Sequence, residues 1–255
     1  MIGLTSGSTA AEDQIREIDQ YGFAVVPRVV DSDTVESLLA GLSQIERCAS
    51  VSRHERVYAI RNLLEVVPAI RELAASERVR CLVEPVLSEG AFPVQGIFFD
   101  KPADVNWKVP WHQDLSIPVK ARIEVAGFGP WSIKAGVPHV QPPARLLERM
   151  LIVRLHLDDC MEQNGPLRVI PGSHRHGRLD RAQLEFWRDR GEETACLVPR
   201  GGALLMRPLL LHASSAAEAP GHRRVIHLEY AADPLPGDLA WYHGRLQHLS
   251  EGGSA

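Results

Sequence analysis

The sequence is short of the features that mark several classes of protein. It has four cysteines, Cys48, Cys81, Cys160 and Cys196, and no C-x-x-C pair, which argues against a disulfide framework or a thiolate zinc site. No run approaches the roughly 20 apolar residues of a transmembrane helix. The first residues, MIGLTSGSTAAEDQ, have neither the basic nor the apolar region of a signal peptide.

The sequence also lacks an excess of basic charge. The formal net charge is −4, which leaves no electrostatic footprint for nucleic acid or for an anionic membrane. Together with the widely spaced cysteines, this balance predicts a protein of the reducing cytoplasm that binds neither nucleic acid nor a membrane.

What remains is the composition of an ordinary globular protein. The chain has 255 residues, of which 45% are hydrophobic and 24% are charged, as is typical of a folded chain with a sizeable core. This length suits one large domain or two small ones. Because no internal repeat or low-complexity linker divides the sequence, we expect a single domain over residues 1–255, with residues 1–10 loosely held.

Patterns typical of helices come first along the chain. Residues 9–20 predict a short helix, and residues 21–27 then predict a strand. A second helix is expected to begin at Asp31 or Ser32, either of which can cap it. Two shorter helices are expected near residues 66–75 and 77–88.

From residue 92 onward the sequence changes to short runs rich in aromatic and β-branched residues. Turns that contain Gly or Pro separate these runs. The predicted strands span residues 92–101, 150–158, 166–170, 195–199, 203–207 and 223–231. We therefore expect a mainly β fold, a sandwich or barrel, with flanking α-helices packed outside it.

Residues 116–145 interrupt this pattern with many glycines and prolines. A long loop of this kind in a compact domain is typical of a binding loop or an active-site lid. The alternative is a solvated excursion of the chain. We expect a lid, and we take Trp131, Lys134 and His139 within it as candidate substrate contacts.

The strongest local signal is the H-x-D pair His112 and Asp114. In an extended chain, residues two apart point to the same face, so this imidazole and this carboxylate can converge on one metal ion. They supply two of the three ligands of the facial triad used by non-haem iron(II) enzymes. An H-x-D pair occurs often by chance, so the third ligand has to be found elsewhere in the chain.

About a hundred residues later, His212 ends an apolar run, and Arg223 follows eleven residues after it at the start of a strand-like segment. A histidine in this position is either a hydrogen-bonded core residue or the third ligand. A guanidinium that enters a core needs a carboxylate partner. A dicarboxylate ligand is a natural candidate for that partner.

This arrangement resembles the 2-oxoglutarate oxygenases, and more narrowly the phytanoyl-CoA dioxygenase family. The resemblance covers roughly residues 15–232 and combines the order of the motifs with their spacing. The stretches that carry it are F-D-K-P at 99–102, W-H-Q-D at 111–114, L-D-D at 157–159, N-G-P-L-R-V-I-P-G-S-H at 164–174 and H-A-S at 212–214.

The resemblance implies a double-stranded β-helix, also called a jelly roll, of the cupin-like type. It implies Fe(II) held by His112, Asp114 and His212, with 2-oxoglutarate and O₂ as co-substrates. It further implies that Arg223 and Ser214 bind the C5 carboxylate of 2-oxoglutarate. Related halogenases lack the carboxylate at the position of Asp114, so its presence favours hydroxylation or another two-electron oxidation of the substrate.

Three other residues are weaker candidates. The resemblance suggests Gln95, on the strand before the metal motif, as a co-substrate contact. Arg154 and His156 alternate with apolar residues in their predicted strand, so both face one side, which is either the interior of the barrel or solvent.

The substrate class stays open at this stage. We expect a small molecule: an acid, an amino acid, an acyl thioester or a secondary metabolite. Two rival functions use the same fold or ligands, namely a zinc hydrolase, since zinc also accepts two histidines and a carboxylate, and a non-catalytic jelly-roll binding protein. Arg223 argues against the hydrolase, and the intact triad argues against the binding protein.

Overall fold

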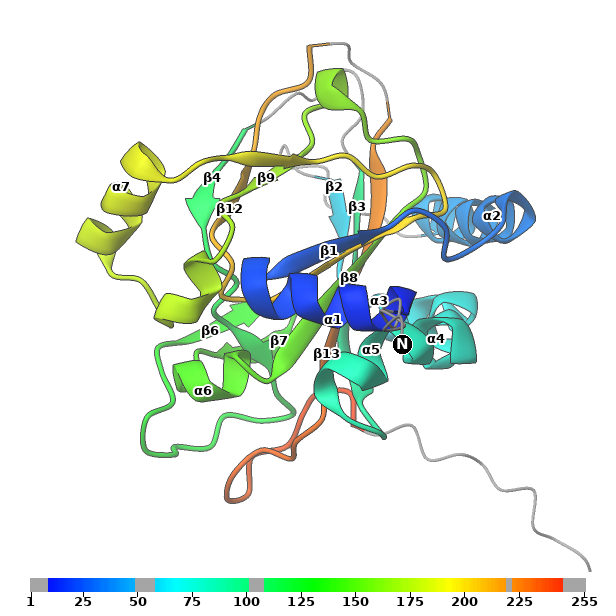
Figure 1. Ribbon diagram of the computed structural model, residues 1–255. Coiled ribbons are helices and arrows are strands. Elements are labelled where there is room, and N and C mark those ends of the chain that lie inside the picture. The colour runs from blue at the N-terminus through cyan, green and yellow to red at the C-terminus, as the bar shows by residue number, and fades with distance from the viewer. Residues whose placement is uncertain (1–8, 49–57, 101–107, 219–221, 245–255) are drawn as a thin grey trace, which may run out of the picture.

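The computed structural model describes residues 9–48, 58–100, 108–218 and 222–244. At its centre is a six-stranded antiparallel sheet in the order β1-β11-β8-β13-β3-β2 (Figure 1). Its strands are β1 (Phe23–Val26), β11 (Ala203–Met206), β8 (Met150–His156), β13 (Arg224–Ala231), β3 (Phe92–Asp100) and β2 (Tyr58–Ile60). The long strands β8, β13 and β3 lie in the middle, where both faces of the sheet are covered.

A second, four-stranded antiparallel sheet has the order β10-β9-β12-β4. Its strands are β10 (Thr194–Cys196), β9 (Leu167–Val169), β12 (His212–Ser214) and β4 (Val109–His112). One hydrophobic cluster joins the two sheets, with Ile152, Leu204 and Met206 from the first and Leu167 and Val169 from the second. The two sheets therefore pack face to face, as in a jelly roll.

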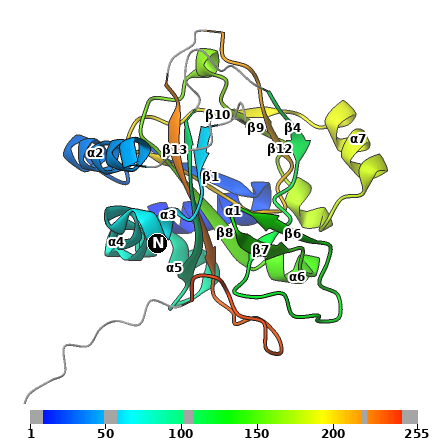
Figure 2. The same cartoon turned by 180° about the vertical axis from the view of Figure 1, so that it is seen from behind.

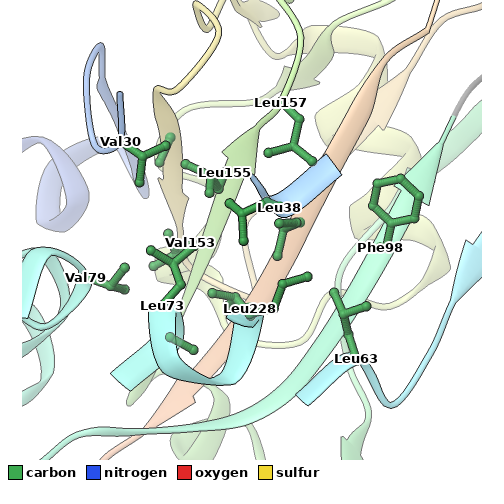
Figure 3. Close-up of a cluster of buried hydrophobic side chains, with 14 of the residues drawn as sticks. Val30, Leu38, Leu63, Leu73, Val79, Phe98, Val153, Leu155, Leu157 and Leu228 are labelled. Carbon is green, nitrogen blue, oxygen red and sulfur yellow. The ribbon is translucent and has the colours of Figure 1, made fainter. Parts of the chain in front are cut away.

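Helices cover the opposite face of the six-stranded sheet, away from the four-stranded sheet (Figures 1 and 2). They are α1 (Ala10–Tyr21), α2 (Ser32–Cys48), α3 (Leu63–Val66), α4 (Pro68–Ala75) and α5 (Glu77–Leu87). The alternation of the strands explains this layer, because Ile226, Leu228 and Tyr230 of β13 join the apolar side chains of the helices in one core. Figure 3 shows Leu228 of this core together with Leu63 and Leu73 of the helices. The Tyr230 hydroxyl donates a hydrogen bond of 2.9 Å to the carbonyl of Ala74 on α4, which satisfies its one polar atom in this core.

The boundaries of α1 follow from its end residues. Thr9 and Glu12 form a reciprocal capping box at its N-terminus, and Gly22, with a φ of 89°, ends the helix in the left-handed conformation. Residues 1–8 of the segment expected to be loose lie outside the described residues, whereas Thr9 and Ala10 begin this helix. None of the helices described is long and apolar enough to cross a membrane.

Residues 116–145 have more regular structure than the expected loop. They form a three-stranded sheet in the order β5-β7-β6 and the short helix α6. The bounds are β5 (Ile117–Pro118), β6 (Trp131–Lys134), β7 (Val137–Val140) and α6 (Ala144–Leu147). Ile117, Val119 and Val140 of this unit are buried with Phe92 and Val94 of β3, so this layer is anchored to the central sheet.

The predicted mainly β fold with flanking helices is confirmed. The predicted strands at 203–207 and 223–231 correspond to β11 and β13 within a residue or so. The helix expected near 66–75 corresponds to α4, which begins at Pro68, the position where proline is best tolerated. The short helix α3 before it was not expected. The pattern missed β2, β4 and the helix α7 (Arg181–Arg190).

Candidate metal centre

Three side chains meet where β4 and β12 pair. His112 ends β4, Asp114 follows it by two residues, and His212 begins β12 directly opposite His112 in the register. One ligand atom from each of the three lies within 4.8 Å of the others. The Asp114 carboxylate oxygens lie 3.9 Å from His112 Nε2 and 3.7 Å from His212 Nε2. The H-x-D pair and the distant histidine are thus brought together as a two-histidine, one-carboxylate cluster.

Backbone carbonyls fix the tautomer of both imidazoles. His112 Nδ1 lies 2.8 Å from the carbonyl oxygen of Pro110, and His212 Nδ1 lies 2.8 Å from that of Leu210. A carbonyl oxygen only accepts, so each Nδ1 carries the proton and donates it. Each Nε2 is then left with a free lone pair that faces Asp114, which is the arrangement of a metal-ligating histidine.

The charge states of the cluster also suit a metal ion. Burial lowers the pKa of His212 to about 4, an effect that Asp114 only partly opposes, so its imidazole is neutral near pH 7. For Asp114, burial raises the pKa, but the nearby His212, His227 and His112 outweigh it and bring the pKa below its usual value. Neutral imidazoles and an ionised carboxylate are the forms that bind a divalent cation.

The side chain of Gln113, between the two ligands, points away from them and anchors this segment to the rest of the protein. Its amide nitrogen donates to the carbonyls of Gly177 (2.9 Å) and Leu209 (2.7 Å), and its amide oxygen accepts from the backbone N–H of Leu179 (2.9 Å). Sequence reasoning did not single out this residue. The alternation of an extended chain is the signal that could have found it, because the residue between two cavity-facing ligands points into the core.

The triad opens into a cavity of about 390 Å³ between the two sheets. One face of the central sheet forms its floor, since Gln95, Ile97 and Phe99 of β3 lie beside Glu229, His227 and Val225 of β13 in the register. Along β3 and β13, the side chains that face the cavity therefore alternate with the core side chains that face the helices, as the two-residue period of a strand requires.

At one end of this cavity, buried hydrogen-bonding groups have no partner. Arg223 Nε and Ser214 Oγ are buried without a hydrogen-bond partner in the described part of the chain, and so is Arg154 Nε on the neighbouring β8. Burial lowers the pKa of Arg223. Its guanidinium donates to the carbonyl of Gly165, yet it pairs with no carboxylate among the residues described. Buried donors of this kind require an acceptor, and a bound carboxylate fits them.

A row of hydrogen-bonded polar side chains crosses the cavity floor. Arg154 Nη1 lies 2.9 Å from His227 Nδ1, and His227 Nε2 lies 3.3 Å from a Glu229 carboxylate oxygen. Because a guanidinium can only donate, His227 Nδ1 accepts and its Nε2 carries the proton toward Glu229. Sequence reasoning singled out neither His227 nor Glu229. Their placement depends on strand pairing that no local pattern reveals.

The structure places some of the other predicted site residues in the cavity lining and others outside it. Lys134 lines the cavity, as do Gln95 and Arg154. His139 is buried behind Gln95, with 3.4 Å between their Nε2 atoms. His156 is buried on the Arg154 side of β8 outside the cavity lining, and Trp131 is half-buried beneath the Arg122 guanidinium. The structure therefore brings the triad, Arg223, Ser214, Gln95, Arg154 and Lys134 into one cavity and leaves Trp131, His139 and His156 out of its lining.

Comparisons with known proteins agree with this architecture. An ectoine dioxygenase of Bordetella bronchiseptica is 24% identical to this chain over 172 residues, which are 64% of this chain and 49% of that protein. The chain thus spans about half the length of the curated relatives it matches.

Solved structures share the fold. The crystal structure of EctD from S. alaskensis with 2-oxoglutarate and 5-hydroxyectoine has a TM-score of 0.67 at 20% identity, covering 91% of this chain and 79% of that one. The non-heme alpha ketoglutarate dependent carbocyclase SnoK from nogalamycin biosynthesis has a TM-score of 0.68 at 16% identity, covering 89% and 88% of the two chains. The double-stranded β-helix expected from the sequence is therefore confirmed.

The family model described as Phytanoyl-CoA dioxygenase (PhyH) matches residues 18–225. These residues include β3 and β8 of the large sheet, the start of β13, the three side chains of the metal cluster and Arg223. The chain belongs to the phytanoyl-CoA dioxygenase family.

Proposed function

We propose that the chain is a mononuclear non-haem iron(II) oxygenase. In the net reaction, 2-oxoglutarate and O₂ are converted to succinate and CO₂, and a C–H bond of a small organic molecule becomes C–OH. The observation that carries this proposal is the combination, in one cavity, of a two-histidine, one-carboxylate cluster with the unpartnered donors of Arg223 and Ser214.

His112, Asp114 and His212 are the residues that would hold the metal. Two imidazole nitrogens and one carboxylate oxygen on one side of an ion are the donor set of the facial triad, which leaves further coordination positions for other ligands. Bound there with 2-oxoglutarate, Fe(II) supplies the activation of O₂ that oxidises an otherwise unreactive C–H bond. Family membership supports Fe(II) over other divalent ions at this site.

Arg223 and Ser214 are the residues that would hold the C5 carboxylate of 2-oxoglutarate. A guanidinium binds a carboxylate through two parallel hydrogen bonds, and a hydroxyl can add a third. The buried Arg154 next to them contributes further positive charge at the same end. Gln95 lies opposite Glu229 in the strand register, at the other end of the floor. We propose that Gln95 contacts a part of 2-oxoglutarate other than its C5 carboxylate.

The rest of the chain would orient the substrate and keep water from the reacting atoms. Apolar side chains of the cavity wall, among them Ile97, Phe99, Leu115 and Val225, limit the access of water. Residues 116–145 are proposed to act as a lid, because Ser116 and Lys134 of this segment line the cavity. A cavity of this size suits a small molecule. We also propose a reducing cytoplasm as the compartment, on the ground of the widely spaced cysteines in the sequence.

A zinc hydrolase is the alternative that shares the ligand set. It has no use for an arginine Nε and a hydroxyl that are buried without a hydrogen-bond partner beside the metal cluster, as those of Arg223 and Ser214 are in the described residues. This is the physical reason to prefer the oxygenase, and it makes Arg223 the residue to test.

The test compares two adjacent arginines. Arg223→Gln should raise the KM for 2-oxoglutarate by about 10- to 100-fold, because a hydrogen bond to a charged group contributes about 1.5–3 kcal/mol. Arg224→Gln is the matched control, since Arg224 pairs with Asp158 at 2.6 Å and does not line the cavity. The readouts are the rate of succinate formation against 2-oxoglutarate concentration and direct binding of 2-oxoglutarate. Equal 2-oxoglutarate affinity in wild type and Arg223→Gln would contradict the proposal.

A further inference from the structure

Positive charge exceeds negative charge in the cavity. The cationic side chains of its lining are Arg61, Lys108, Lys134, Arg154 and Arg223, and the carboxylates are Asp114 and Glu229. The proposed Fe(II) and the two carboxylates of 2-oxoglutarate cancel each other, so the loaded cavity still carries about three excess positive charges. Partly buried cations without counter-charges are costly, and this excess is what an anionic ligand would relieve.

Arg61 and Lys134 account for two of these three charges, and neither residue belongs to the proposed 2-oxoglutarate site. Both are half-buried in the cavity wall, and neither forms an ion pair with a carboxylate in the described ranges. Lys134 Nζ donates a hydrogen bond of 2.5 Å to Ser116 Oγ, which leaves its remaining N–H groups and its charge available.

Local backbone geometry holds these two cations together. Asn62 Nδ2 donates to the carbonyl of Ala135 at 3.4 Å, which ties the residue after Arg61 to the residue after Lys134. Asn62 and Ala135 have φ values of 58° and 48°, and they are the non-glycine residues with left-handed backbone in the described chain. Such conformations cost free energy and tend to cluster at binding sites.

The Arg61 and Lys134 pair lies apart from the proposed C5 carboxylate site. Arg223 adjoins the start of β13 and Glu229 lies near its end, six residues and therefore about 20 Å along the strand. Burial lowers the pKa of Lys134, and the charges of Arg61, Glu229 and Asp114 also act on it. For Arg154, by contrast, burial and the charge of Arg223 lower the pKa. Asp114 of the metal cluster acts on both Lys134 and Arg154 and lines the same cavity.

We infer that Arg61 and Lys134 form a second anion subsite that binds a carboxylate or phosphate group of the organic substrate. This inference rests on the proposed function, in which Arg223 is occupied by 2-oxoglutarate. The substrate is accordingly an organic acid or a phosphate ester that reaches the metal cluster from the Lys134 end of the cavity. The Glu229 carboxylate in the same end accepts a hydrogen bond from a hydroxyl or ammonium group of that molecule.

Small anions test the subsite without knowledge of the substrate. Acetate, inorganic phosphate and the uncharged acetamide are titrated anaerobically into protein loaded with Fe(II) and saturating 2-oxoglutarate, with binding followed by calorimetry. We expect acetate or phosphate to bind and acetamide not to bind, and the stronger of the two anions identifies the acid or the phosphate ester. Arg61→Gln and Lys134→Gln should each weaken anion binding by about tenfold, as loss of one charged hydrogen bond predicts.

Matched controls separate this subsite from general charge effects. Arg181→Gln and Lys120→Gln change exposed side chains outside the cavity and should leave anion binding unchanged. Anion binding that is absent in wild type, or equal in the cavity variants and the controls, would overturn the inference. Loss of 2-oxoglutarate affinity in Arg61→Gln or Lys134→Gln would also overturn it, by assigning these residues to the co-substrate.

The same titration in the Arg223→Gln background keeps the two proposals distinguishable. If wild-type protein fails to bind 2-oxoglutarate, the proposed function fails. Anion binding is then measured in Arg223→Gln protein, in which the positive charge at the other end of the cavity is reduced. Anion binding that depends on Arg61 and Lys134 in that protein would support the subsite on its own.

Discussion

The alternation of side chains along an extended chain accounts for most of the metal cluster. His112 and Asp114 are two residues apart and share a face, and the antiparallel pairing of β4 with β12 brings His212 opposite His112. The backbone carbonyls of Pro110 and Leu210 then set the imidazole tautomers. The first of these steps can be read from the sequence, whereas the others require the strand register.

Asp114→Ala removes the carboxylate from the cluster. We expect loss of substrate hydroxylation, with Fe(II) bound at least tenfold more weakly, because one anionic ligand is lost. Global stability should be little changed, since the Asp114 side chain faces the cavity. The measurements are Fe(II) titration, product formation and thermal unfolding. Asp189→Ala, at an exposed carboxylate on α7, is the control, and full hydroxylation activity in Asp114→Ala would remove this residue from the metal site.

The residues that sequence reasoning missed share one property. Glu229, His227 and Arg61 have no motif of their own, and each acquires a role from a neighbour that is distant in the chain, such as Arg154 beside His227. Local patterns and a family resemblance identify ligands at fixed spacing. They do not identify charges that meet only through tertiary packing.

At the level of elements, the strongly patterned ones were predicted and the short ones were not. β8, β11 and β13 are long or apolar enough to be read from composition, and α1 has a complete capping box. β5 to β7 were read as loop because proline and glycine are frequent there, although these strands pair with one another. The helix α7 was overlooked despite its capping box of Asp180 and Gln183, because none of its residues is fully buried and its apolar contact with the core is limited to Leu184 and Trp187.

The turn between β10 and β11 gives an element-scale prediction. Gly201 has a φ of 77°, and a Cβ placed there would lie 2.4 Å from the carbonyl oxygen of Val30. Gly201→Ala should therefore lower the free energy of unfolding by about 3 kcal/mol, through left-handed strain plus a backbone clash. Gly136→Ala has a similar φ of 80° with open space around it, so it should cost about 1 kcal/mol. Chemical denaturation measures both, and equal losses would show that the close approach at Gly201 has no energetic effect.

For the whole molecule, the buried histidines make stability depend on pH. Burial lowers the pKa of His139, His174 and His212 to about 4, from 6.5 for an unperturbed histidine. Between these values the unfolded chain binds more protons than the native protein, so the free energy of unfolding rises with pH. The metal-free protein should lose stability steadily from about pH 6.5 down to pH 4.

His139→Gln tests this pH dependence at one site. His139 Nδ1 donates to the carbonyl of Val137 and its Nε2 faces the amide of Gln95, so a second proton would have no acceptor. The substitution should reduce the slope of unfolding free energy against pH by up to about 1.4 kcal/mol per pH unit between pH 4 and 6.5. Urea unfolding at a series of pH values measures the slope, and a slope as steep as that of wild type would contradict the assignment.

The central claim is that one cavity binds a metal through His112, Asp114 and His212 and a keto acid next to it. Adding Fe(II) and then 2-oxoglutarate to the protein without oxygen tests this most directly, because chelation of the keto acid to the ion gives a visible metal-to-ligand charge-transfer band. We predict that the band forms in wild type and in His176→Ala, at an exposed histidine outside the cavity, and is lost in His212→Ala. Folded, iron-loaded wild-type protein that gives no band, or an unchanged band in His212→Ala, would contradict the account.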